Sequence, residues 1–394
     1  MTVIDIPEGS PFGPANLPYG VFSTPGTAPR VGVRVGDSVL DLAVALDEEV
    51  FARPTLNPFM AQGHARWVQV RERITALIAG EVPDAAVHPV AEVELHLPFE
   101  VADYVDFYAS EHHATNLGRL FRPNAEPLMP NWKHLPVGYH GRSGTVVVSG
   151  TDIARPNGQR KAPDEEAPTF GPCRRLDIEA ELGFVVGTGS ELGSPVPCEE
   201  FATRVFGAVL VNDWSARDIQ AWEYVPLGPF LGKSFATSVS PWVVPLLALE
   251  AARVPTPEQD PRPLPYLREG EPWGLDIDLA VDWNGRRVAN PPYREMYWSP
   301  AQLLAHLTVN GASTRTGDLY ASGTISGPEK DQRGAFIELT WGGKEPIEIG
   351  GSERTFLQDG DEVVISATAP GADGTRIGFG QVSGRIVPAE GGAR

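Results

Sequence analysis

The segment Leu176-Asp-Ile-Glu-Ala-Glu-Leu-Gly-Phe-Val-Val186 ends in an uninterrupted apolar run, which is typical of a buried strand. Successive side chains of a strand point to opposite faces, so Glu179 and Glu181 project from the same face. Two like charges side by side require a counter-ion, and all-oxygen, negative sites suit Mg²⁺ or Ca²⁺ rather than zinc. The alternative interpretation of this pair is a solvated outer face of a strand.

Three further strand-like runs cover residues 206–211, 275–288 and 356–366. The last two contain Asn284-Gly285 and Asp359-Gly360, dipeptides typical of tight hairpin turns. Residues 30–42 alternate apolar and polar side chains around Gly36, which predicts another hairpin near the N-terminus. We therefore predict a mainly β chain.

Two segments have helical features. Apolar residues recur at helical spacing between His64 and Gly80, which predicts a helix there. The combination of Ser299, Pro300 and Gln302 predicts the start of a second helix that ends near Gly311. A Pro- and Ala-rich segment before Phe99 predicts a division into residues 1–98 and 99–394.

The composition excludes several classes of protein. The 394 residues include 32 Lys and Arg against 51 Asp and Glu, and the formal charge of −19 argues against nucleic-acid binding. Polar residues interrupt the longest charge-free segments, so no membrane span is expected. The two cysteines cannot supply a disulfide framework, and the acidic start lacks the features of a signal peptide. We expect a soluble, cytoplasmic protein.

Candidate catalytic residues gather before and after these strands. Asp213 follows the strand-like run 206–211, where a side chain can point into a cleft, and Asp106 could complete a pocket with Glu179 and Glu181. A helix over residues 106–118 would place Asp106 and His113 on one face, with His112 pointing elsewhere. The alternative is that both histidines are surface or capping residues.

Polar donors follow Asp213 in the sequence. Asp213, Arg217 and Gln220 recur at helical steps of four and three residues, which selects one face. Lys233 follows two glycines separated by three residues, whereas a phosphate-binding loop has four, and Pro229 lacks a backbone donor. We therefore interpret Lys233 as a donor into the acidic cleft.

Several long motifs cover most of residues 100–385. They are Asp106-Phe-Tyr with His113-Ala-Thr-Asn116, Pro130-Asn-Trp with Leu135-Pro-Val-Gly-Tyr-His-Gly-Arg142, Asn212-Asp-Trp-Ser-Ala-Arg-Asp-Ile-Gln220, Trp222-Glu-Tyr-Val-Pro-Leu-Gly-Pro-Phe-Leu-Gly-Lys-Ser-Phe235 and Ala321-Ser-Gly-Thr-Ile-Ser-Gly327. In these motifs the sequence closely resembles the fumarylacetoacetate hydrolase family, and within it the fumarylacetoacetase members.

The resemblance implies an N-terminal SH3-like β-barrel over residues 1–98 and a larger fumarylacetoacetase-type β-sandwich roll with a few helices over residues 99–394. It also implies a homodimer. The implied roles are metal ligation by Asp106, Glu179, Glu181 and Asp213, general-base catalysis by His113 oriented by Glu338, and polar donation to the reacting carbonyl by Arg217, Gln220 and Lys233. The implied substrate contacts are Tyr108, Arg122, Tyr139, Arg217, Gln220, Tyr224 and Thr324, and a second, structural cation is implied near Lys233 and Thr237.

The implied reaction is hydrolysis of the carbon–carbon bond of fumarylacetoacetate, a small dianionic diketo acid, to fumarate and acetoacetate, the last step of tyrosine and phenylalanine catabolism. Mg²⁺ or Ca²⁺ would polarise the attacked carbonyl, and an imidazole can accept the proton of water. One alternative is an acylpyruvate hydrolase, decarboxylase or isomerase acting on another 1,3-dicarbonyl acid; the other is a non-catalytic binding protein of the same fold. The motif from Trp222 to Phe235 favours fumarylacetoacetase over the first alternative.

Overall fold

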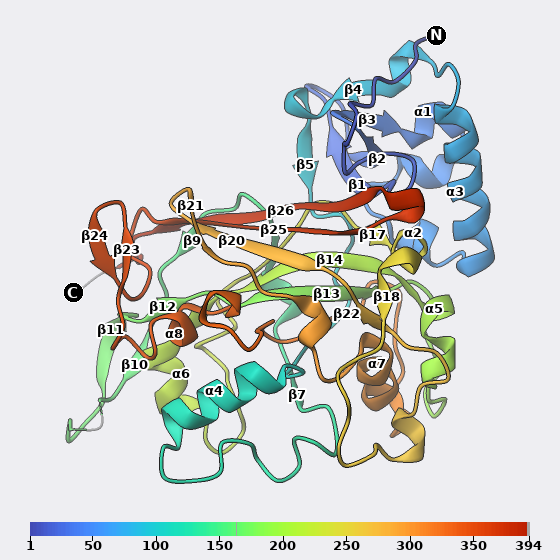
Figure 1. The fold of residues 1–394 in the computed structure, drawn as a ribbon. Helices are drawn as coiled ribbons and strands as arrows, with labels where there is room; N and C mark the ends of the chain where they lie inside the picture. Colours follow the sequence, from blue (N-terminus) through green and yellow to red (C-terminus); the bar gives the residue numbers. More distant parts are fainter. Residues whose placement is uncertain (163, 392–394) are drawn as a thin grey trace.

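The computed structural model describes residues 1–162 and 164–391, and its N-terminal part is built on one antiparallel sheet (Figure 1). The strand order is β4 (Val87–Pro89), β3 (Ser38–Asp41), β2 (Arg30–Val35), β1 (Tyr19–Ser23) and β5 (Glu94–His96). The hairpin predicted around Gly36 is confirmed as β2 and β3, and Gly36 takes a φ of +57° in the turn. Helix α3 (His64–Ile78) covers this sheet and confirms the helix predicted there.

An eight-stranded mixed sheet forms the centre of the larger part. Its order is β7 (Gly138–His140), β6 (Tyr104–Phe107), β22 (Leu319–Ala321), β13 (Ala180–Val186), β14 (Val205–Asp213), β16 (Thr237–Val239) and β8 (Val146–Val148), with β17 (Val244–Pro245) also paired to β14. The β22–β6 and β16–β8 pairs are parallel, and the other pairs are antiparallel.

A five-stranded sheet packs over the central sheet, and two of its strands are the long red strands of Figure 1. Its order is β21 (Arg286–Ala289), β20 (Asp278–Trp283), β25 (Glu362–Pro370), β26 (Arg376–Val387) and β9 (Ile153–Ala154). Leu210 on β14 and Trp214, which directly follows this strand, share one buried core with Ile365 and Phe379 from β25 and β26. Two sheets packed face to face in this way form a β-sandwich.

The central strands are buried on both faces, which explains their nearly continuous apolar sequence. On β14, Ala208 and Leu210 belong to the core of the sandwich, whereas Val209 and Val211 belong to the core shared with the N-terminal sheet. The next position on this second face is Asp213, at the end of the strand. Along this face of β14, the apolar residues that pack against the N-terminal part are therefore followed directly by an acidic residue.

The remaining elements are short. The helices are α1 (Leu42–Leu46), α2 (Asn57–Met60), α4 (Glu111–Phe121), α5 (Phe201–Arg204), α6 (Arg217–Glu223), α7 (Pro300–Thr308) and α8 (Phe336–Leu339). Two-stranded pairs are β10 (Asn157–Arg160) with β11 (Thr169–Pro172), β12 (Leu176–Asp177) with β15 (Ser215–Ala216), β18 (Arg253–Val254) with β19 (Gly274–Leu275), and β23 (Ile347–Ile349) with β24 (Ser352–Arg354). Strands greatly outnumber helices here, so the predicted mainly β fold is confirmed.

The outcomes of the turn predictions differ. The hairpin at Asn284-Gly285 is confirmed, because both residues have positive φ and connect β20 to β21. The helix predicted from Ser299 is confirmed as α7, with both halves of its capping box formed. The hairpin predicted at Asp359-Gly360 is wrong. Leu357, before this turn, pairs instead with Leu176, and Asp359 is held by Arg155 at 2.6 Å, so the turn connects an isolated bridge to β25.

Among the helices in residues 1–162 and 164–391, none has both the length and the apolar character needed to cross a bilayer.

Candidate active site

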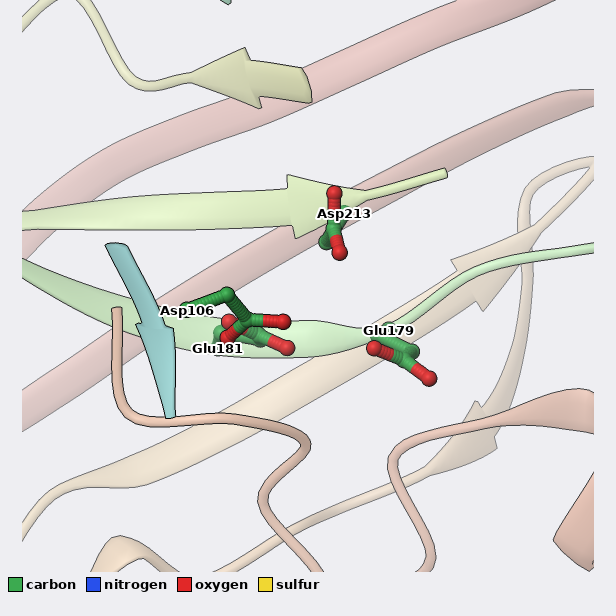
Figure 2. Close-up of side chains that lie close together, drawn as sticks. All are labelled: Asp106, Glu179, Glu181 and Asp213. Atoms are coloured by element: carbon green, nitrogen blue, oxygen red, sulfur yellow. The ribbon is translucent and has the colours of Figure 1, made fainter. Parts of the chain in front are cut away.

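Four buried carboxylates meet at one end of the central sheet (Figure 2). Asp106 lies on β6, Glu181 lies on β13, Glu179 directly precedes β13, and Asp213 ends β14. One carboxylate oxygen from each residue can be chosen so that the four oxygens all lie within 4.8 Å of one another. Strand segments that are distant in sequence therefore supply one acidic cluster.

The cluster fits a hard divalent cation. Glu181 is completely buried, and neither of its carboxylate oxygens has a hydrogen-bond partner among the described residues; the same is true of Asp106 Oδ1. Buried polar atoms in folded proteins normally have a hydrogen-bond partner or a bound ion. These oxygens therefore require a ligand that the chain itself does not supply. An all-oxygen donor set of this charge suits Mg²⁺ or Ca²⁺.

The pKa values of the cluster show the same excess of negative charge. Burial, followed by repulsion from Asp213, raises the pKa of Asp106 well above its ordinary value. Burial, followed by repulsion from Asp106, Glu179 and Asp213, raises the pKa of Glu181 in the same way. Both shifts mean that the ionised cluster is under-neutralised by the protein alone.

Glu179 differs because two cations face it. Burial opposes its ionisation, but Lys233 and Arg217 outweigh that effect and hold the pKa of Glu179 far below its usual range. Lys233 Nζ donates to Glu179 and, at 2.7 Å, to Asp213 Oδ2. The preceding residue, Gly232, packs closely against α6, because a Cβ there would lie 2.9 Å from the backbone of Gln220.

Arg217 is fixed on three sides at the start of α6. Its Nε donates to Asp177 Oδ2 at 2.8 Å, and its Nη1 lies 2.7 Å from Glu179 and 3.2 Å from Gln220 Oε1. Its Nη2 is buried and has no partner among the described residues. Arg217 and Gln220 share the helix as predicted, whereas Asp213 belongs to β14, so the predicted single helical face for all three residues is wrong.

A buried imidazole–carboxylate pair lies beside the cluster. His113 Nδ1 is 2.6 Å from Glu338 Oε2, and both side chains are buried. Asn116 Nδ2 donates to Glu338 Oε1, and Ser326 Oγ donates to Glu338 Oε2, each at 2.9 Å. Burial alone would raise the pKa of Glu338, but His113 and these two donors outweigh it and hold the pKa below its ordinary value.

His113, rather than His112, lies beside the cluster, but for a different reason from the one predicted. Residues 106–118 do not form one helix: Asp106 is on β6, and α4 begins at Glu111 with Ser110 as its N-cap. The turn between them still brings His113 to the cluster. The His113 side chain is 2% exposed, whereas His112 is 35% exposed and lies 3.7 Å from Glu295.

A cavity of about 370 Å³ joins these groups. Its lining includes Asp106, Tyr108, His113, Arg122, Tyr139, Glu179, Arg217, Gln220, Tyr224, Lys233 and Thr324. Glu181 and Glu338 do not line this cavity, whereas Asp106 of the cluster and His113, the partner of Glu338, do. Arg122 Nε and Thr324 Oγ1 are buried polar atoms of the lining without a partner among the described residues, which is the condition expected before a polar ligand binds.

A second cavity of about 150 Å³ lies on the other side of Tyr139 and Lys233. Its lining includes Asp213 and Thr237, and Thr237 Oγ1 donates to Asp213 Oδ1 at 2.9 Å. Tyr139 donates its hydroxyl to Asp213 Oδ2 at 3.2 Å. Thr237 therefore contacts the acidic cluster from this second cavity rather than from the larger one.

Three residues of the site were missed by the sequence analysis. Asp177 binds Arg217, and Asn116 and Ser326 bind Glu338. The signal for Asp177 was present, because it precedes Glu179 and Glu181 in the same alternation. Asn116 and Ser326 lie within the long motifs of the sequence, but their partner, Glu338, is distant from both motifs.

Comparisons with known proteins identify one family. Residues 15–98 match the family described as Fumarylacetoacetase N-terminal, and residues 103–387 match Fumarylacetoacetate (FAA) hydrolase C-terminal. The chain is 50% identical to fumarylacetoacetase of Homo sapiens over 99% of both chains, and 45% identical to that of Arabidopsis thaliana over 98% of both.

Solved structures show the same fold at low sequence identity. A fumarylacetoacetate hydrolase of Exiguobacterium antarcticum has a TM-score of 0.57 and 18% identity, covering 94% of this chain and 99% of that one. A maleylpyruvate hydrolase of Sphingobium, solved with manganese(II) and pyruvate, has a TM-score of 0.55 and 15% identity, covering 95% and 100%. With the family matches over both parts and the identity along nearly the whole length, the chain belongs to the fumarylacetoacetate hydrolase family.

Proposed function

We propose that this chain hydrolyses fumarylacetoacetate to fumarate and acetoacetate with the help of a bound Mg²⁺ or Ca²⁺. The observation that carries the proposal is the buried His113–Glu338 pair at 2.6 Å, because His113 lines the same cavity as Asp106 and Glu179 of the four-carboxylate cluster. The high identity to fumarylacetoacetases supports the choice of substrate. The reaction belongs to the breakdown of tyrosine and phenylalanine.

His113 is the proposed general base. Because Glu338 binds Nδ1, that nitrogen carries the proton and Nε2 is the basic nitrogen. When Nε2 accepts a proton from water, the Glu338 carboxylate stabilises the resulting imidazolium. Asn116 and Ser326 keep the carboxylate ionised and in place, because each donates a hydrogen bond to it. The water oxygen then forms the new bond to the carbonyl carbon next to the fumaryl double bond. The bond from that carbon to the central methylene breaks, and the proton taken up by His113 passes to the leaving carbon, which gives acetoacetate.

Asp106, Glu179, Glu181 and Asp213 are the proposed cation ligands. When bound, the cation would polarise the attacked carbonyl and stabilise the departing enolate. The chain adds its own donors: two of the three Lys233 protons are used by Glu179 and Asp213, which leaves one N–H for substrate oxygen. Arg217 contributes Nη2, which no described residue binds, and Gln220 retains its amide NH₂ because its Oε1 accepts from Arg217.

The two substrate carboxylates require donors elsewhere in the cavity. Arg122 Nη2 donates to Pro127 O at 2.7 Å, while its Nε is buried and has no partner among the described residues. We propose that Arg122 binds a terminal carboxylate, with further contacts from the lining residues Tyr108, Tyr139, Tyr224 and Thr324. Lys233 and Thr237 border the proposed second cation site, to which Lys233 can offer only its carbonyl oxygen, since its ammonium group is a donor.

We also propose that the chain functions as a homodimer in the cytoplasm. The loop after Tyr224 supports the dimer, because Leu227 is 95% exposed and Phe230 is 68% exposed beside the cavity. The two cysteines, Cys173 and Cys198, are buried free thiols, which is compatible with a reducing compartment. Light scattering after size-exclusion chromatography would measure the mass directly, and a monomeric mass would contradict the dimer.

The test of the reaction is a product analysis in H₂¹⁸O. We expect loss of the ultraviolet absorbance of fumarylacetoacetate, equimolar fumarate and acetoacetate, and one ¹⁸O atom in a fumarate carboxylate. Release of carbon dioxide would indicate a decarboxylase, and an isomer of the same mass would indicate an isomerase. If the protein leaves fumarylacetoacetate intact but releases pyruvate from an acylpyruvate, the proposed substrate is wrong.

A further inference from the structure

We propose that Asp177 is a positioning residue that couples the substrate-binding Arg217 to the Glu338–His113 pair. The role of these partners rests on the function proposed above, but the coupling itself is a property of the fold. Asp177 is not one of the four carboxylates of the acidic cluster, its carboxylate has no hydrogen bond with His113 in the described structure, and it does not line the cavity. Its side chain is completely buried between two parts of the active site.

One carboxylate joins two separate elements. Asp177 Oδ2 accepts from Arg217 Nε at 2.8 Å and from the backbone N–H of Ile337 at 3.0 Å. Asp177 Oδ1 accepts from the N–H of Phe336 at 2.7 Å and from its neighbour Ile178 at 2.8 Å. The first contact orients the guanidinium at the start of α6, and the contacts with residues 336 and 337 fix the start of α8.

Each of these two elements carries a functional group of the active site. With Nε held by Asp177 and Nη1 held by Glu179, the guanidinium plane of Arg217 is fixed and Nη2 remains unpartnered beside the cavity. On the other side, Glu338 is the residue directly after Ile337, so the position of α8 sets the distance from its carboxylate to His113 Nδ1. A shift of Asp177 would therefore move both Arg217, the proposed donor to the substrate carbonyl, and Glu338, which orients His113.

A carboxylate rather than an amide is needed for this arrangement. It has acceptor sites for all four N–H donors, whereas asparagine turns one of its two oxygens into a donor. In either orientation of an asparagine at position 177, the NH₂ group would face two of the four N–H groups. The buried Arg217 would also lose one of its two carboxylate partners.

The experiment compares Asp177→Asn with Asp361→Asn in the Mg²⁺-saturated protein. Asp361 is a matched control, because it is also buried and accepts from an arginine, Arg354, and from the backbone N–H of Gln358 at 2.7 Å, yet it lies outside the cavity. We measure thermal unfolding, kcat and KM for fumarylacetoacetate, and the downfield proton resonance of His113 Nδ1 in protein labelled with ¹⁵N-histidine. Glu338→Gln identifies that resonance by removing it.

We expect both asparagine variants to lower the unfolding temperature, and only Asp177→Asn to lower kcat, by about 10- to 100-fold, with a much smaller change in KM. Asp177→Asn should also shift or broaden the His113 resonance, which Asp361→Asn leaves unchanged. Equal kcat losses in the two variants, or an unchanged resonance in folded Asp177→Asn, would overturn the proposal. The resonance does not depend on turnover, so it tests the coupling even if fumarylacetoacetate is not the substrate.

If Asp177→Asn does not fold, the coupling is tested by changing Arg217, the hydrogen-bond partner of Asp177. Arg217→Lys should then disturb the His113 resonance through Asp177 and α8, although Arg217 contacts neither His113 nor Glu338 in the described structure. An unchanged resonance in that variant would contradict the coupling.

Discussion

Replacing Glu181 by glutamine should stabilise the metal-free protein while weakening its affinity for Mg²⁺. Glu181 is completely buried, and both of its oxygens lack a hydrogen-bond partner among the described residues. Glutamine keeps the volume, removes the charge and supplies an amide donor next to Asp106. Most substitutions of buried residues destabilise a protein, so the predicted sign distinguishes a cation site from an ordinary structural glutamate.

The size of the effect follows from the cost of an unpaired buried group. That cost is about 1–3 kcal/mol for a polar group and larger for a charged one, so we expect the free energy of unfolding in chelator to rise by about 1–3 kcal/mol. Loss of a charged ligand should weaken Mg²⁺ binding by about 10- to 100-fold. For the wild type, Mg²⁺ at 100 times its dissociation constant would add about 2.7 kcal/mol, and Glu181→Gln would lose most of that gain.

The pH dependence has a definite sign. Burial and the neighbouring carboxylates raise the pKa of Glu181 above its value in the unfolded chain, which is about 4.3. The stability contributed by its protonated form is therefore complete below the unfolded pKa and is lost as the pH rises through the raised folded pKa. In chelator, the wild type should lose stability over this window, and Glu181→Gln should lose less.

Urea unfolding in EDTA and in excess Mg²⁺ would measure these effects, with Glu338→Gln as the matched control. Glu338 is equally buried, but its carboxylate is satisfied by His113, Asn116 and Ser326. The control should therefore destabilise the protein in EDTA and retain Mg²⁺ binding. If Glu181→Gln destabilises the metal-free protein as much as the control does, the reasoning about an under-neutralised cluster is refuted.

Three further results are expected. His113→Ala should lower kcat by about 10²- to 10⁴-fold and leave Mg²⁺ binding measured by calorimetry intact, whereas His112→Ala should preserve both; the reverse result would make His112 the base. Removal of bound metal by EDTA should stop turnover and added Mg²⁺ should restore it, so an undiminished rate in verified metal-free protein would contradict the role of the cation. Arg122→Met should raise KM by about 10- to 100-fold through loss of a charged hydrogen bond, with a smaller effect on kcat, and an unchanged KM would show that the carboxylate binds elsewhere.

Local periodicity predicted those parts of the fold that depend on neighbouring residues. The helix from His64, the capped helix from Ser299 and the turn at Asn284-Gly285 all formed as expected, because capping and turn geometry act over a few positions. The turn at Asp359-Gly360 did not form a hairpin. There the long-range ion pair with Arg155 and the pairing with Leu176 decide where the chain goes, and neither is encoded nearby.

For the site, too, the sequence predicted the local groupings and not the long-range ones. Alternation placed Glu179 and Glu181 together, because both positions belong to one short segment. Asp106 and Asp213 join them through strand order, with β22 and β13 lying between β6 and β14, and sequence alternation carries no information on that order. The link from Asp177 to α8 joins residues about 160 positions apart, so only the folded structure reveals it.

The central claim is that the four carboxylates bind one divalent cation beside His113. Anomalous diffraction from crystals soaked in Mn²⁺, a substitute for Mg²⁺ with a measurable signal, tests it most directly. We predict one strong peak bonded to oxygens of Asp106, Glu179, Glu181 and Asp213, which is weaker in Glu181→Gln crystals soaked at the same subsaturating Mn²⁺ concentration. Crystals saturated with Mn²⁺ that show no peak between these side chains would contradict the account.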